Sequence, residues 1–164
     1  MSTPQLLDFV TEPVSPGPWA KATMARHLEL VLSDGTVRWL RPWNGETSEQ
    51  QAHQAANRGT GVYIRIAGMP AIEGGPKKID PVMLYMDFQV AAVGLQRKTA
   101  DDTAHDVAWQ IRQALRGTAD GVPFINDRLG WRYENALPVL ETTACCIRSL
   151  VMHVACALRD WDAK

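Results

Sequence analysis

Four residues near the C-terminus have the chemistry of a metal site. Cys145, Cys146, His153 and Cys156 lie close together in the sequence, and thiolates and imidazole are ligands that zinc prefers. Their spacing matches no zinc-binding pattern, and in a strand His153 and Cys156 would lie on opposite faces because side chains alternate. We therefore expect three reduced, unbridged cysteines that pack as small apolar residues and bind no metal.

Other residue groups that could support catalysis have simpler structural explanations. Asp101 and Asp102 form an acidic pair, but they follow Thr99 at a helix start, where capping and the helix dipole favour carboxylates. The glycines and lysines of residues 74–78 follow no strand-to-helix phosphate-binding pattern, and Pro76 removes one backbone amide. The four histidines are scattered, and no hydrolase or metalloprotease motif occurs. The sequence therefore predicts a protein that is not an enzyme, with no catalytic residue and no cofactor.

The helix expected at 99–116 contains an aromatic residue that its core-facing side does not explain. Thr99 is its N-cap and Gly117 is a typical C′ glycine. At 100° per residue, Trp109 falls about 160° from the apolar stripe, so it should face away from the sheet on which the helix packs. Two explanations stay open: segment 118–143 covers Trp109, or a neighbouring subunit does. The stripe consists of Ala104, Val107, Ala108, Ile111 and Leu115.

The strand expected at 82–92 is the clearest in the chain. Its apolar residues recur at every second position, so we expect one buried face and one polar face. Strands 61–67 and 147–158 should pair with it in one sheet. The last of these has apolar residues on both faces, which is typical of an inner strand. The polar row of strand 82–92 is Tyr85, Asp87 and Gln89.

The N-terminal region allows two interpretations. Residues 1–17 are rich in proline and lack a core pattern, so we expect a flexible arm. Pro18 suits the first position of a helix with one apolar face. Alternatively, leucines at every second position form a strand that turns at Asp34-Gly35 into strand 36–41 as a hairpin. The helix is the preferred interpretation, and its expected apolar face is Met24, Ala25, Leu28, Val31 and Leu32.

The remaining segments complete a single domain of residues 18–164. A polar helix with little to bury should follow a strand that Pro42 stops. A loop rich in glycine and proline, too long for a tight turn, should precede the central strand. After the main helix the pattern is irregular. In chain order these segments are strand 36–41, helix 47–58, loop 68–81 and the irregular stretch 118–143.

Composition excludes several classes of protein. The chain has 164 residues with 17 basic and 18 acidic side chains, so its near-zero net charge indicates neither nucleic-acid nor anionic-membrane binding. No apolar run approaches the ~20 residues of a membrane span, and the N-terminus is unlike a signal peptide. We expect a cytosolic α+β protein whose mostly antiparallel sheet has about four strands with helices packed on it.

The order of elements resembles a family of structural phage proteins. Helix, GTVRWLRPWNGE, helix, GVYIRIAG, long loop, strand, helix and strand follow one another across residues 18–158. This order is similar to that of the tail-terminator or tail-completion proteins of tailed bacteriophages, in particular the Mu-like branch. The family's proline-aromatic-x-Gly-Glu segment is Pro42-Trp43-Asn44-Gly45-Glu46 here. Two features differ: Thr60-Gly61 stands where the family commonly has leucine-proline, and residues 1–17 have no counterpart.

The resemblance implies a structural role in the virion. Such proteins form a ring, usually six-fold, at the head-proximal end of the tail tube, stop its polymerisation and offer a docking surface to the head. The implied partners are further copies of the chain, the tube protein, a head–tail connector protein and, in a contractile tail, the sheath protein. No membrane and no sequence-specific nucleic acid is implied. Assembly would take place in the cytoplasm of the bacterial host.

Other classes of function stay open beside this one. The chain could be another head–tail connector protein, of the stopper or joining kind, or a small-ligand-binding α+β module, or an enzyme of unrecognised type. If it forms a ring, we expect the arm 1–17, the loop 68–81 and the outer face of helix 99–116 to make contacts, because none has a core or catalytic explanation. The candidate interface residues are Phe9, Trp43, Met69, Ile72, Lys77, Lys78, Trp109 and Arg112.

Overall fold

The computed structural model describes residues 16–72, 79–95, 97–116 and 130–159 of the chain. Within these ranges three helices and five strands follow one another as α1–β1–α2–β2–β3–α3–β4–β5. The strands form one sheet in the order β1-β2-β3-β5-β4, in which only β1 and β2 run parallel. The expected α+β class is confirmed, with five strands in place of about four. Phe9, Lys77, Lys78 and Gly117, named above, lie outside the described residues.

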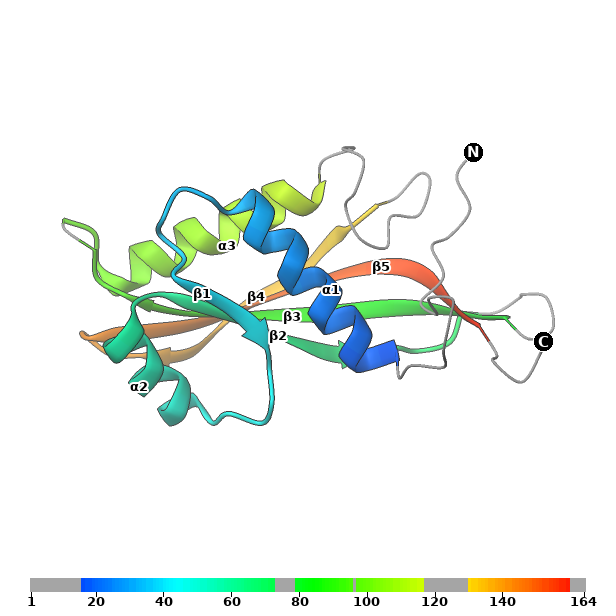
Figure 1. The fold of residues 1–164 in the computed structure, drawn as a ribbon, viewed down its shortest axis with the longest axis horizontal. Helices are drawn as coiled ribbons and strands as arrows, with labels where there is room; N and C mark the ends of the chain where they lie inside the picture. Colours follow the sequence, from blue (N-terminus) through cyan, green and yellow to red (C-terminus); the bar gives the residue numbers. More distant parts are fainter. Residues whose placement is uncertain (1–15, 73–78, 96, 117–129, 160–164) are drawn as a thin grey trace.

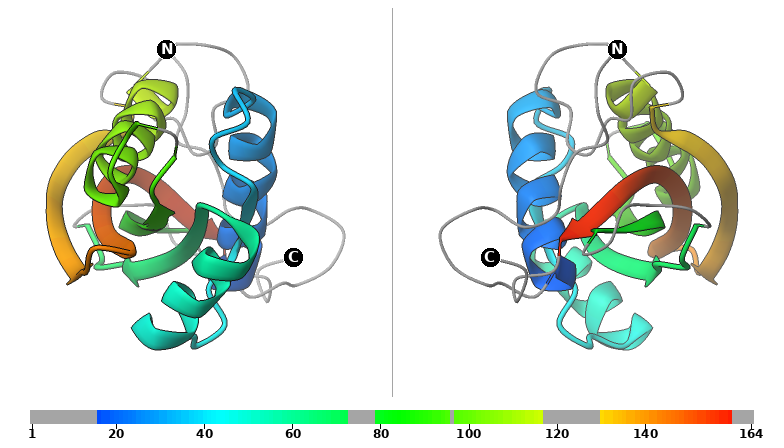
Figure 2. Two further views of the ribbon diagram at one scale, coloured as in Figure 1. Left: turned by 90° about the vertical axis from the view of Figure 1, so that its left-hand side faces the viewer. Right: turned by 90° about the vertical axis from the view of Figure 1, so that its right-hand side faces the viewer.

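Helices cover both faces of the sheet. α1 (Pro16–Val31) and α3 (Ala100–Arg116) lie on one face, and α2 (Ser48–Arg58) lies on the other (Figure 1). α2 connects β1 (Trp39–Pro42) to β2 (Gly61–Gly68), as parallel neighbours require a crossover connection. Figure 2 shows the same layers from the side. We call the two sides the α1/α3 face and the α2 face.

The main core lies on the α1/α3 face, between the sheet and the two helices. β3 (Ile79–Val93) and β5 (Cys145–Arg159) pair along their whole length, and β5 is an inner strand, as predicted. Val107, Ile111 and Leu115 of α3 are buried against them. The predicted sheet partners and the predicted core face of α3 are therefore confirmed. Each such apolar side chain contributes roughly 1.5–3 kcal/mol when it leaves water.

The start of α3 confirms that the aspartates there belong to a helix cap. The backbone N–H of Asp102 donates to Thr99 Oγ1 at 3.1 Å, which is N-cap geometry. Asp101 lies at the positive end of the helix dipole, and its Oδ1 is 3.3 Å from Nη1 of Arg148 on β5. These contacts explain the acidic pair without a catalytic role.

The N-terminal region forms the helix and not the hairpin. Met24 and Leu28 are fully buried, and Leu30, which a strand would have aligned with Leu28, is 80% exposed. The helical period therefore dominates over the alternation of leucines. Two details of the prediction are wrong: α1 begins at Pro16, within the expected arm, and Val31 is 44% exposed instead of joining the core.

The first strand begins later than predicted. Instead of 36–41, β1 covers Trp39–Pro42, because Asp34 accepts a hydrogen bond from the N–H of Thr36 at 3.0 Å and holds the preceding residues in a turn. The strand does not stop before Pro42, as predicted, but includes it, and Pro42 pairs with Ile64. This is possible because β1 is an edge strand, where a missing N–H costs no ladder bond.

The loop predicted at 68–81 is partly ordered as an antiparallel extension of β2 and β3. The N–H of Met83 donates to the carbonyl of Pro70 at 2.9 Å, and the N–H of Ile72 donates to that of Pro81 at 2.8 Å. β3 already begins at Ile79. Residues 73–78 lie outside the described part of the chain.

The stretch 118–143, which was predicted to be irregular, contains a strand that the sequence did not predict. β4 (Arg132–Glu141) pairs antiparallel with β5, and its register shifts between Tyr133 and Asn135 and again between Pro138 and Leu140. Each β-bulge adds a residue and breaks the two-residue period, so the strand has no alternating pattern. Bulges and a proline are also devices that keep edge strands from pairing with other chains.

The core face of α3 gives a first prediction. Ile111→Asp should prevent folding, because an unpaired carboxylate in this seam costs several kcal/mol against a total stability of about 5–15 kcal/mol. Gln113→Asp, at an exposed position of the same helix, is the control and should melt like the parent. Circular dichroism during thermal melting measures both. A soluble Ile111→Asp protein that melts cooperatively would show that this face is not the core.

Candidate functional site

A buried carboxylate organises the α2 face of the sheet. Asp87 on β3 is 1% exposed. Its Oδ2 accepts a hydrogen bond from Arg65 Nε at 2.9 Å and lies 2.8 Å from Nη2 of the same guanidinium. Its Oδ1 accepts from the hydroxyl of Ser149 at 2.5 Å. Because Arg65 belongs to β2 and Ser149 to β5, this one side chain ties β3 to both of its neighbours.

Two glutamines extend this network to α2. Gln89 donates from Nε2 to Asp87 Oδ2 at 3.2 Å, and its Oε1 accepts from Nε2 of Gln51 at 2.8 Å. Gln51 and Ala55 are the two residues that α2 buries. The second face of β3 carries the predicted polar residues, but the expectation that only one face is buried is wrong, because the β1–α2–β2 connection places α2 over Asp87 and Gln89. The expectation that α2 has little to bury is confirmed, because it buries only two residues. One of them, Gln51, is the residue that connects α2 to the network.

An aromatic cluster joins β1 to the same face. The indole of Trp39 lies against β2 so closely that a Cβ on Gly61 would be 1.9 Å from its Cε2 atom, and only glycine fits there. Trp39 Nε1 donates to the carbonyl of Gly59 at 3.1 Å, and its ring meets Tyr63 edge-on with 4.7 Å between centroids. Tyr63 is fully buried. These contacts fix β1 and therefore the turn that follows it.

The turn from Pro42 to Glu46 is held by Glu46. One carboxylate oxygen accepts from Arg41 Nη2 at 3.1 Å, and the other accepts from the N–H of Asn44 at 2.8 Å. The carbonyl of Glu46 accepts from the indole of Trp43 at 2.9 Å and from Gln51 at 3.4 Å. The segment that carries the family resemblance is thus a structural unit, connected through Gln51 to the buried network.

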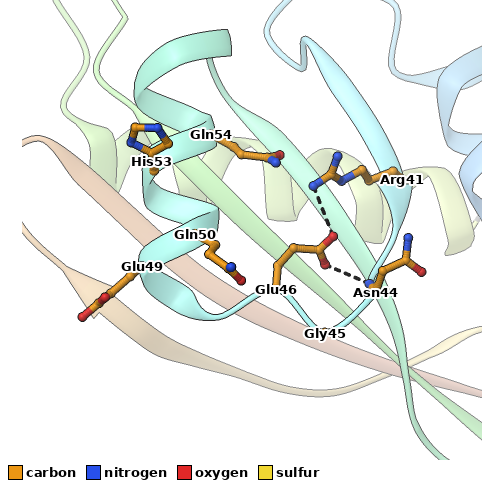
Figure 3. Close-up of a pocket in the computed structure, with 8 residues that line it drawn as sticks. All are labelled: Arg41, Asn44, Gly45, Glu46, Glu49, Gln50, His53 and Gln54. Atoms are coloured by element: carbon orange, nitrogen blue, oxygen red, sulfur yellow. Dashed lines mark hydrogen bonds and ion pairs between the residues drawn. The ribbon is translucent and has the colours of Figure 1, made fainter.

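The surface beside this turn is an open polar hollow between β1 and α2. In Figure 3 the side chains of Arg41, Glu46 and Gln54 point toward one another, whereas Glu49 and His53 point away. Gln54 accepts a hydrogen bond from the hydroxyl of Tyr63 at 2.8 Å. The hollow is lined by Arg41, Asn44, Gly45, Glu46, Glu49, Gln50, His53 and Gln54.

Several polar groups that line the hollow already have partners within the chain. Its guanidinium and the carboxylate of Glu46 already neutralise each other, and Gln54 is engaged by Tyr63. His53 forms a hydrogen bond with Asn57, one turn further along α2, at 3.0 Å. A general base must lie within hydrogen-bonding distance of the proton that it abstracts, and covalent catalysis needs a side-chain nucleophile. No serine, threonine, cysteine or lysine is among the residues that line this hollow.

Trp109 and Arg112 form a pair on the outer side of α3. Trp109 is 57% exposed, and the guanidinium of Arg112 lies 4.9 Å from the centroid of its ring. Trp109 and Val31 line a shallow groove between the end of α1 and α3. Exposed Leu30 precedes Val31. We call Val31, Trp109 and Arg112 the Trp109 surface. Val31 was not among the predicted interface residues, because the sequence placed it on the apolar face of its helix.

The other predicted interface residues do not gather in one place. Trp43 is half-buried, with its indole tied to Glu46 and the guanidinium of Arg65 5.5 Å from its ring centroid. Met69 is partly buried and packs on the main core. Ile72 is 37% exposed beside the start of β3. Phe9, Lys77 and Lys78 lie outside the described residues, so the structure has nothing on these three.

The three cysteines are buried and free. Strand register places Cys156 opposite Val82 and His153 opposite Tyr85, so the two lie on different faces of β5, as alternation predicts. In the described part of the chain no three potential metal ligands lie together. Burial raises the pKa of the Cys145 thiol. It also raises the pKa of Cys146 to about 11 and that of Cys156 to about 12.

Comparisons with known proteins add no name to this site. No protein-family model matches the chain, and no curated protein matches it. Among the described residues, no helix is long and apolar enough to cross a membrane.

The buried network gives a second prediction. Asp87→Ala leaves Arg65 and Ser149 without their partner, and removing one member of a buried ion pair costs about 3–5 kcal/mol. Because Arg65 can still reach water, we expect the lower end of that range. Ser149→Ala removes a single hydrogen bond to a charged group and should cost less, about 1.5–3 kcal/mol. Denaturant unfolding of both variants measures the free energy of unfolding.

Asp106→Ala is the matched control for this prediction. It removes the carboxylate of an exposed ion pair with Lys98, which contributes little to stability because water and salt screen it. Equal stabilities of Asp87→Ala and Asp106→Ala would show that the buried network does not organise the α2 face.

The raised thiol pKa values give a third prediction, for alkaline pH. Unfolded thiols ionise near pH ~8.5, whereas the folded thiol of Cys156 keeps its proton. Above about pH 8.5 the unfolded state therefore binds fewer protons, and the stability from Cys156 is lost as pH rises, by up to about 1.4 kcal/mol per unit. Cys156→Ala should show a flatter decline of unfolding free energy between neutral and alkaline pH. Identical slopes would contradict a protonated, buried thiol.

Proposed function

We propose that this chain is a structural protein of a tailed-phage virion, a tail-terminator or tail-completion subunit. Copies of it would form a ring, most simply a hexamer, at the head-proximal end of the tail tube. The observation that carries the proposal is the Pro42–Glu46 turn in its place between β1 and α2, within an element order that resembles this family. Both carboxylate oxygens and the carbonyl of Glu46 accept hydrogen bonds from within the chain.

The exposed surfaces support a role in assembly. A cyclic ring uses one patch of each subunit against a different patch of its neighbour. The described residues present two separate apolar regions, the Trp109 surface and the edge strand β4, where Tyr133, Leu137 and Val139 are each at least 43% exposed. Tryptophan and arginine are the residues most enriched at the energetic centres of interfaces. The Trp109 surface is therefore our first choice for the subunit contact.

The partners follow from this role. The ring would contact the tube protein on one side and a head–tail connector protein on the other, with the sheath protein added if the tail contracts. The protein would reside in the virion after assembly in the host cytoplasm. A different position in the head–tail connection, as a stopper or joining protein, would use the same kind of ring.

A small-ligand-binding module is the second candidate, and the hollow beside α2 is the observation in its favour. Ligand sites usually combine an apolar lining with a few convergent polar groups. The hollow is open, its lining contains no apolar side chain larger than glycine among the residues that form it, and its charged groups Arg41 and Glu46 are already paired with each other. We therefore place assembly ahead of ligand binding, and an enzymatic role behind both.

The role of the Trp109 surface gives a fourth prediction. Trp109→Ala should weaken self-association by about thirtyfold or more, since an interface hot spot contributes about 2 kcal/mol or more. The subunit itself should keep its secondary structure. Its free energy of unfolding should lie within about 0.5 kcal/mol of the parent's, because the side chain is exposed. Sedimentation velocity over a range of concentrations measures association, and circular dichroism measures folding.

Leu95→Ala is the control, because Leu95 is 44% exposed but lies in the turn between β3 and α3 and not on the Trp109 surface. It should associate like the parent. A parent protein that assembles, with a Trp109→Ala variant that assembles equally well, would remove this surface from the mechanism while leaving ring formation intact.

A further inference from the structure

We infer that the Asn44-Gly45 peptide is a site of spontaneous asparagine deamidation and isomerisation. This inference concerns the chemistry of the turn before α2 and does not depend on the proposed function. It rests on three observations: a glycine that follows the asparagine, an unengaged carboxamide, and a neighbouring carboxylate that the product would disturb.

The position of Gly45 favours the reaction. Cyclisation requires the backbone nitrogen of the next residue to reach the side-chain carbonyl carbon of asparagine, and a Cβ on that residue hinders the approach. Gly45 has no Cβ, and no atom lies within 4 Å of where one would be. Its φ of 93° is a conformation that other residues rarely adopt, so glycine is both required by the turn and permissive for the attack.

The carboxamide of Asn44 is free to react. The residue is exposed, and its backbone N–H, not its side chain, contacts Glu46. Within the described residues the Asn44 carboxamide makes no hydrogen bond. Figure 3 shows it directed away from Glu46 and from α2.

The reaction balances with water as the only co-reactant. The amide nitrogen of Gly45, on losing its proton to base, attacks Cγ of Asn44 and forms a five-membered succinimide. The bond from Cγ to Nδ2 breaks, and the nitrogen leaves as ammonia with that proton. Water then opens the ring at either carbonyl, giving aspartate or isoaspartate at position 44. One water is consumed and one ammonia is released, with no change of oxidation state.

Two other asparagines serve as internal references. Asn57 lies within α2, where helical hydrogen bonds fix the backbone, and its side chain is bonded to His53 at 3.0 Å. Asn135 lies in β4, where the N–H of Ala136 donates to its Oδ1 at 2.8 Å. Neither is followed by glycine.

The product would disturb the turn in a defined way. Aspartate at position 44 adds a negative charge beside Glu46, whose carboxylate already accepts the N–H of residue 44 at 2.8 Å. Isoaspartate also lengthens the backbone by one carbon between β1 and α2. Both changes affect the hydrogen bond between the N–H of residue 44 and the carboxylate of Glu46.

The test is incubation of the full-length protein in heavy-oxygen water at mildly alkaline pH, followed by peptide mapping with mass spectrometry. We expect label at position 44 to accumulate at least about tenfold faster than at Asn57 and Asn135, which corresponds to about 1.4 kcal/mol in activation free energy. The incubated parent should also become more acidic on isoelectric focusing. In Asn44→Gln the acidic form should be strongly reduced.

Two outcomes would overturn the inference. One is labelling of Asn44 no faster than that of Asn57 and Asn135. The other is an acidic form that accumulates equally in the parent and in Asn44→Gln. Because this substitution keeps the backbone N–H that binds Glu46, the turn should form in the variant, and its melting temperature checks this.

Discussion

The buried carboxylate of Asp87 is the interaction on which the α2 side of the molecule depends. A charge that is removed from water is stable only when ionic and hydrogen-bonding partners surround it. Here the partners come from β2, β3 and β5, and Gln51 of α2 is reached through Gln89. Such a network adds little net stability compared with an apolar core, but the contacts we describe are satisfied together in this strand register and helix position. We therefore interpret it as a device that specifies the arrangement of β1, α2 and β2 on the sheet.

This constraint explains how the polar residues nearest to the hollow are used. Glu46, Arg41 and Gln51 hold the turn that leads into α2, and Tyr63 occupies Gln54. The polar chemistry that the sequence places around Pro42–Glu46 is used to build the fold. The large apolar side chains of Trp109, Val31 and Leu30 are exposed on the helices that cover the α1/α3 face. This distribution of paired polar groups and an exposed apolar surface supports the proposed role in assembly.

Elements with a complete periodic signal could be predicted from the sequence, and those whose signal depends on tertiary contacts could not. α3 showed its cap, its stripe and its outward Trp109, and all are present in the structure. β4 was missed because two bulges break its alternation. The burial of Asp87 and Gln89 was missed because only the parallel pairing of β1 and β2 places α2 above them. A buried polar pair looks like a solvated face when the covering helix is unknown. For the site, Trp109 could be found from its helical angle, whereas Val31 lies beside it only because α1 packs next to α3.

The central claim is that the chain works as an assembled ring. The most direct measurement is the mass of the purified full-length protein in solution across a range of concentrations, combined with negative-stain images of the same sample. Our account predicts a closed species of several subunits, most simply six, that appears as rings of uniform diameter. A protein that stays monomeric at all concentrations and shows no rings, alone or with tail tube protein, would contradict it.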